Sequence, residues 1–172
     1  KLAGEGVQIV LTYPNNDAGG LLIIDCLKDF MKIAPPNVQL HRSVGRYNYH
    51  GILSLAMDPE VRCLCLGNSS SGIKETPAFG CPTVNIGSRQ DGRLRAENVI
   101  DVGYDAKAIY TAVIRCLEDK AFRDICHSSE NPYGLGDAGE KIAEVLSKIS
   151  LDENILRKRM TLSGVKQEFK MR

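Results

Sequence analysis

The chain has 172 residues, which is enough for one domain with a buried core and too few for two domains of ordinary size. Its net charge is +1 and its charged share is 25%, so no strong field favours a nucleic acid or a membrane as partner. No apolar run approaches the roughly 20 residues needed to cross a bilayer, and the start carries no signal-peptide pattern.

Short apolar runs alternate along the chain with segments of helical periodicity. The runs predict strands at residues 7–12, 38–41, 61–66, 82–86 and 98–102. The periodic segments predict helices at residues 21–30, 47–57, 74–79, 105–117, 138–149 and 152–159. Asp105 is the expected N-cap of its helix, and Pro77 is expected to delay or kink the helix that contains it.

The alternation of strands and helices indicates an α/β fold. The strands lack an inside–outside alternation, which is typical of a mostly parallel sheet covered by helices on both faces. We expect this domain to occupy residues 1–160 and a loosely organised tail to occupy residues 161–172. Because such sheets bind ligands beyond the carboxyl ends of their strands, the turns after the first, third and fourth strands are the expected site.

Cysteine and histidine give no sign of metal or redox chemistry. The six cysteines are scattered through apolar segments, which favours free, buried thiols in a reducing cytoplasm. Cys63 and Cys65 share one face of a predicted strand and are expected in the core. No histidine has metal-ligand spacing and no P-loop or Gly-x-Gly-x-x-Gly fingerprint is present, so we expect neither a metal nor a cofactor.

The turn after the third predicted strand is the strongest local signal. Residues 67–75 read Gly-Asn-Ser-Ser-Ser-Gly-Ile-Lys-Glu and lead into a helix. Serine hydroxyls and the free N–H groups of a first helical turn suit a phosphate. Glu75, one helical turn beyond Ser71, is placed to take the hydroxyls of a ribose. An ordinary serine N-cap with an acidic first turn is the equally weighted alternative.

Two further turns reach the same edge of the predicted sheet. Arg89 and Arg93 follow the fourth strand, and a guanidinium suits phosphate recognition, although each alone is typical of a solvated surface arginine. Asn15 and Asp17 follow the first strand and either face the ligand or, as is commoner for such residues, cap their own turn.

Several segments together resemble one family, the UDP-N-acetylglucosamine 2-epimerases. The matching blocks fall in the family's order and are residues 12–20, 44–49, 67–80, 82–93, 97–101 and 131–134. The triple serine and the Gly-Arg-x-x-Tyr of residues 45–49 are similar to the hydrolysing branch. That branch makes N-acetylmannosamine for sialic acid pathways.

The resemblance implies the carboxy-terminal, Rossmann-like half of a glycosyltransferase-B-type protein, with UDP-N-acetylglucosamine in the cleft between two domains. At matching positions it implies UDP contacts for Ser69, Ser70, Glu75 and Arg89 and a ligand-side position for Asn15. No catalytic residue is expected in this span, because the family's catalytic carboxylates lie in the amino-terminal domain. The resemblance also implies a homo-oligomer, and a missing first strand and helix ahead of Lys1.

Departures from the family pattern leave alternatives open. Leu21 stands where a basic residue is common, and Leu135 where an acidic residue is usual. The alternatives to a hydrolysing epimerase are a non-hydrolysing epimerase or UDP-sugar glycosyltransferase domain, and a non-catalytic UDP-binding module. The fragment alone is expected to be inactive and to bind UDP weakly, because half of a cleft leaves the ligand partly in water.

Overall fold

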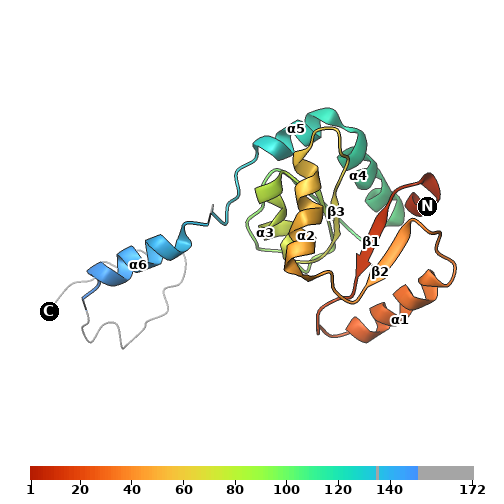
Figure 1. The fold of residues 1–172 in the computed structure, drawn as a ribbon, viewed down its shortest axis with the longest axis horizontal. Helices are drawn as coiled ribbons and strands as arrows, with labels where there is room; N and C mark the ends of the chain where they lie inside the picture. Colours follow the sequence, from red (N-terminus) through yellow and green to blue (C-terminus); the bar gives the residue numbers. More distant parts are fainter. Residues whose placement is uncertain (135, 151–172) are drawn as a thin grey trace. The chain divides into compact units, whose positions relative to one another are not determined.

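The computed structural model describes residues 1–134 and 136–150, and the elements are shown in Figure 1. The five strands are β1 (Ile9–Thr12), β2 (Val38–His41), β3 (Cys65–Gly67), β4 (Thr83–Ile86) and β5 (Val99–Val102). The α-helices are α1 (Gly20–Met31), α2 (Gly45–Ser54), α3 (Ser71–Lys74), α4 (Ala106–Glu118), α5 (Lys120–Ser128) and α6 (Ala138–Lys148). Short 3-10 helices are η1 (Leu2–Glu5), η2 (Leu55–Met57) and η3 (Thr76–Phe79).

The chain divides into two compact units. The first, Lys1–Tyr133, holds every described strand, and the second begins at Gly134 and includes α6. The predicted helix at residues 152–159, the predicted domain limit at residue 160 and the predicted tail lie outside the described residues. None of the described helices is long and apolar enough to cross a bilayer.

The strands confirm the α/β prediction and its parallel pairing, and they form two sheets. β1 pairs with β2, and β3, β4 and β5 form a second sheet in that order. β3 is shorter than predicted, because the register would place Leu64 opposite Pro82, which has no N–H to donate. Cys65 N–H still donates to the Pro82 carbonyl at 2.9 Å, so the ladder begins there.

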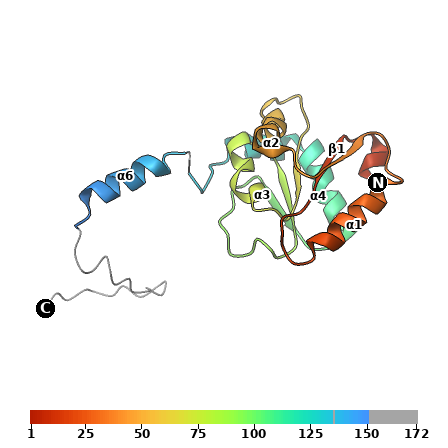
Figure 2. The same cartoon turned by 60° about the horizontal axis from the view of Figure 1, so that its bottom comes forward.

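Helices cover both faces of the β3–β5 sheet, as the view in Figure 2 shows for α3 and α4. Val84 of β4 packs into one core cluster with α4 and α5. On the opposite face Leu53 of α2 and Cys81 form a second cluster, against which Phe79 packs. β4 is therefore buried on both sides, which explains why its sequence shows no inside–outside alternation.

Local sequence signals account for most helix boundaries. Asp105 is the N-cap of α4 as predicted, and its Oδ1 accepts from Ala108 N–H at 2.8 Å. α5 was not predicted, although Asp119 caps it in the same way and accepts from Phe122 N–H at 3.1 Å. That hydrogen bond holds the pKa of the Asp119 carboxyl below its ordinary value. An N-cap search between residues 117 and 130 would have found α5.

The predicted helix at residues 74–79 is wrong as a single element. The segment forms α3 over Ser71–Lys74 and then η3 over Thr76–Phe79. Pro77 sits in the first turn of η3, where its missing N–H and fixed φ are tolerated, whereas inside a continuous α-helix it would break the hydrogen-bond ladder.

We predict that the purified chain self-associates through unpaired strand edges. Among the described residues β1 and β3 each have a partner on one side only, and Val10 in β1 is 44% exposed. Light scattering should show a mass above that of the monomer, and Val10→Lys should reduce it. Leu94→Lys, at a loop position that is 64% exposed, is the matched control and should leave the mass unchanged. A stable wild-type monomer would contradict the prediction.

Candidate functional site

The turns after β1, β3 and β4 meet at the carboxyl edge, and Arg89 joins them. Its Nη1 donates to the carbonyl of Asn68, after β3, at 2.9 Å. Its Nη2 forms an ion pair with Asp17 Oδ2, after β1, at 2.5 Å. A guanidinium has five N–H groups, so three remain for a ligand. Asp17 thus serves as a partner of Arg89.

The segment Asn68–Ser71, which we call the serine corner, is anchored to the interior by the buried side chain of Gln90. This side chain is 2% exposed, and its Nε2 donates to the Asn68 carbonyl at 2.7 Å. Its buried Oε1 has no partner within the described residues. Gln90 therefore fixes the same carbonyl that Arg89 contacts. Sequence reasoning missed Gln90, because nothing in its neighbours marks it as buried.

The hydroxyls of the serine corner have different environments. Ser69 is exposed, and its Oγ accepts from Ser71 N–H at 3.3 Å. Ser71 Oγ is hydrogen-bonded to the hydroxyl of Tyr49, whose pKa is raised by burial. Ser70, the N-cap of α3, makes no side-chain capping bond. Within the described residues neither the Ser69 nor the Ser70 hydroxyl donates a hydrogen bond, so both protons are available to a ligand.

The first-turn N–H groups of α3 are already bonded, contrary to the expectation of a free anion site there. Besides the Ser71 contact, Gly72 N–H donates to the Ser69 carbonyl at 3.2 Å and Ile73 N–H to the Ser70 carbonyl at 3.1 Å. Short bonds of this type commonly satisfy the first donors of a helix. Recognition of an anion at this corner therefore relies on groups other than these three N–H groups.

A buried polar network ties the serine corner to the sheet. The Thr76 hydroxyl donates to the Gly72 carbonyl at 2.7 Å and accepts from Thr83 Oγ1 at 2.8 Å and from Asn98 Nδ2 at 3.0 Å. Asn98 also donates to the Cys81 carbonyl at 2.7 Å. A Cβ on Gly72 would lie 3.0 Å from the Thr83 methyl group, so glycine lets α3 approach β4. This packing fixes where α3 starts.

The remaining predicted site residues lie around this corner. Glu75, at the end of α3, is half-buried, and its Oε2 is 2.7 Å from His50 Nε2 of α2. Asn15 is exposed after β1 and makes no side-chain hydrogen bond within the described part of the chain. Arg93 is also exposed, and its backbone carbonyl accepts a hydrogen bond from Arg95 Nη1 at 2.7 Å. The contact between His50 and Glu75 was not expected from sequence.

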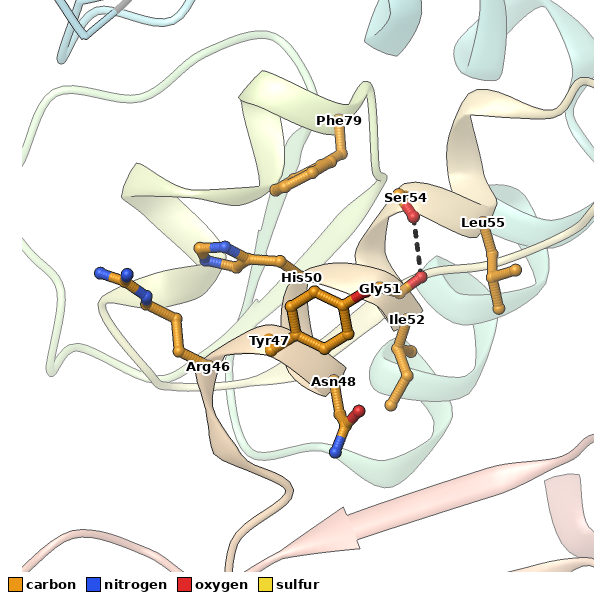
Figure 3. Close-up of a pocket in the computed structure, with 9 residues that line it drawn as sticks. All are labelled: Arg46, Tyr47, Asn48, His50, Gly51, Ile52, Ser54, Leu55 and Phe79. Atoms are coloured by element: carbon orange, nitrogen blue, oxygen red, sulfur yellow. Dashed lines mark hydrogen bonds between the residues drawn. The ribbon is translucent and has the colours of Figure 1, made fainter.

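A groove of about 680 Å³ runs along the outer face of α2 (Figure 3). Its lining includes Arg46, Tyr47, His50 and Phe79, and none of the predicted UDP contacts. The groove therefore lies beside the candidate site, and His50, one of its lining residues, contacts Glu75.

All six cysteines lie in the described part of the chain and have free thiols. Cys81, Cys116 and Cys126 are buried, and Cys63 and Cys65 are half-buried, whereas Cys26 on α1 is exposed, so the expectation of a buried thiol is wrong there. Cys63 and Cys65 pack against the cluster that contains Cys81, as predicted for core positions. Burial raises the pKa of Cys65, and it raises the pKa of Cys116 and Cys126 to about 12. The described residues also contain no group of three or more candidate ligands that could hold a metal ion.

The parallel strands, the helices on both faces and the three converging turns define a Rossmann-like α/β domain. The family described as UDP-N-acetylglucosamine 2-epimerase matches residues 1–147. The chain belongs to this family.

Named relatives agree with this assignment. The chain is 34% identical over 152 residues to a UDP-N,N'-diacetylbacillosamine 2-epimerase (hydrolyzing) of Legionella pneumophila, covering 88% of this chain and 37% of the relative. It is 36% identical over 97 residues to a GDP/UDP-N,N'-diacetylbacillosamine 2-epimerase (hydrolyzing) of Campylobacter jejuni, covering 56% and 24%. It is 28% identical over 148 residues to a UDP-N-acetylglucosamine 2-epimerase of Neisseria meningitidis, covering 83% and 35%. The chain thus spans little more than a third of these relatives at most.

Proposed function

We propose that the chain is the UDP-binding half of a hydrolysing UDP-N-acetylglucosamine 2-epimerase. The observation that carries the proposal is the position of Arg89, which links the turns after three parallel strands and keeps free N–H groups. In the proposed complex Arg89, Ser69 and Ser70 contact the diphosphate. Glu75 takes the ribose hydroxyls, and Asn15 contributes from the turn after β1.

The proposed reaction separates a leaving group from a sugar. A base removes the proton at C2, the bond between C1 and the diphosphate oxygen breaks, and UDP leaves with the bonding electrons. Water then adds to the resulting 2-acetamidoglucal, which gives N-acetylmannosamine. Negative charge grows on the diphosphate as it leaves, so the Arg89 guanidinium and the Ser70 hydroxyl would stabilise the transition state. The base and acid come from outside this span.

A second substrate is favoured by the names of two relatives, which are hydrolysing 2-epimerases for N,N'-diacetylbacillosamine nucleotides. The candidate contacts described above reach the nucleotide and leave the sugar ring to groups elsewhere. UDP-N,N'-diacetylbacillosamine is therefore the second candidate substrate of the whole protein.

The unpaired edges of β1 and β3 support a further part of the proposal. A parallel strand supplied by another segment of the whole protein would pair between them and join the two sheets into one. We propose that this segment precedes Lys1 and that a catalytic amino-terminal domain closes the cleft. We also propose a homo-oligomer, located in the cytoplasm, where the six free thiols stay reduced.

Product analysis on the whole protein tests the function. With UDP-N-acetylglucosamine in D₂O, we expect UDP and free N-acetylmannosamine that carries deuterium at C2, detected by NMR. UDP-N,N'-diacetylbacillosamine, run in parallel, identifies the preferred sugar. An epimerised nucleotide sugar would indicate the non-hydrolysing branch, and a transferred glycan a glycosyltransferase. UDP binding with no turnover of either substrate would indicate that the protein is a non-catalytic UDP-binding module.

A further inference from the structure

Two side chains of α2 hold the two ends of α3. Tyr49 bonds Ser71 at its start, and His50 bonds Glu75 at its end. The His50 and Glu75 side chains are 37% and 42% exposed, so their contact lies at the surface of the site. A carboxylate only accepts hydrogen bonds, so the proton of this contact is on His50 Nε2.

The imidazole itself is held in place by aromatic neighbours. Its centroid lies 5.4 Å from the Phe79 ring and 6.0 Å from the Tyr49 ring, with tilted planes in both cases. Figure 3 shows the ring extending from α2 toward the segment that carries Phe79. Phe79 in turn packs against the cluster of Leu53 and Cys81. The packed rings of Phe79 and Tyr49 therefore fix the direction in which His50 Nε2 donates.

We propose that His50 is a positioning residue for the nucleotide's ribose, acting through Glu75. The inference rests on the proposed function and adds a residue to it. Glu75 has three rotatable side-chain bonds, and ordering them on binding costs affinity. With Oε2 already held by His50, Oε1 and the remaining lone pairs are presented in one orientation to a vicinal pair of hydroxyls. The ligand class is a ribonucleoside diphosphate.

Calorimetric titration of the full-length protein with UDP and with 2',3'-dideoxy-UDP tests this role. His50→Ala should weaken UDP binding about 3- to 10-fold, the range expected when a side chain must be ordered on binding. The same variant should bind the dideoxy nucleotide as wild type does, because that ligand offers Glu75 no hydroxyl. His50→Gln, which returns an amide donor near Nε2, should restore UDP binding, whereas the shorter His50→Asn should not.

Glu75→Ala and Ser54→Ala complete the design. Glu75→Ala should show a larger loss for UDP and none for the dideoxy nucleotide. Ser54 lies on α2, where its hydroxyl donates to the Gly51 carbonyl at 2.8 Å, and its alanine variant should bind as wild type. Thermal unfolding of each variant checks the fold.

Each other outcome overturns something specific. If Glu75→Ala behaves as expected while His50→Ala binds UDP as wild type, the inference is wrong and the proposed function stands. If His50→Ala lost the same affinity for both nucleotides, His50 would have a general structural role, and the inference would also be overturned. No binding of UDP by the wild type would overturn the inference and the proposed function together.

Discussion

Arg89→Ala is expected to weaken UDP binding about 10- to 100-fold, the range for losing charge-assisted hydrogen bonds to a phosphate. The affinity of Arg89→Lys for UDP should lie between those of the wild type and Arg89→Ala. Lysine keeps the charge but lacks the forked donors that reach the Asn68 carbonyl and Asp17 together. Isothermal titration with UDP is the measurement.

Arg62→Ala is the matched control for this prediction. Arg62 also forms an ion pair, with Glu118 at 2.6 Å, and its side chain is 55% exposed. It is separate from the turns that Arg89 joins, so its removal should leave the heat of UDP binding unchanged. Equal heats from wild type, Arg89→Ala and Arg62→Ala would remove Arg89 from the site and with it the observation on which the proposed function depends.

Asn98→Ala is expected to lower the free energy of unfolding by about 2–4 kcal/mol, because two buried hydrogen bonds are lost and the Cys81 carbonyl is left without its Asn98 donor. Asn98 is fully buried, and its amide joins Thr76 of η3 to the Cys81 carbonyl before β4. Urea unfolding measures the change, which should appear as a lower midpoint.

The comparison for Asn98 is Asn48→Ala. Asn48 is exposed on α2 and donates to the Val44 carbonyl at 3.0 Å, so its loss should change the free energy of unfolding by less than about 0.5 kcal/mol. If Asn98→Ala were as stable as Asn48→Ala, the Thr76 network would not anchor α3 and η3 to the sheet.

Local patterns in the sequence predict the elements well where the cause is local. Asp105 caps α4 because a carboxylate three residues before Ala108 reaches its N–H in any helix that starts there. The effect of Pro77 follows from its ring and missing donor. The length of β3 was missed because it depends on Pro82 in the partner strand, and strand pairing is not visible in one segment.

The candidate site shows the same division. The turns after β1, β3 and β4 could be expected to converge from the rule for parallel sheets. The contacts within the site join residues far apart in the sequence: His50 with Glu75, Gln90 with Asn68, and Asp17 with Arg89. Spacing carries no information on such pairs. The expectation of free N–H groups on α3 failed because neighbouring groups of the same turn already bond them.

The ion pair between Asp17 and Arg89 has a consequence for selectivity. An incoming anion does not meet a bare cation; it must share or replace a carboxylate that already lies 2.5 Å from Nη2. A small monovalent ion such as chloride gains little from that exchange, whereas a diphosphate brings more charge and several acceptor oxygens. The pair is therefore expected to disfavour the binding of abundant simple anions at Arg89 relative to a diphosphate.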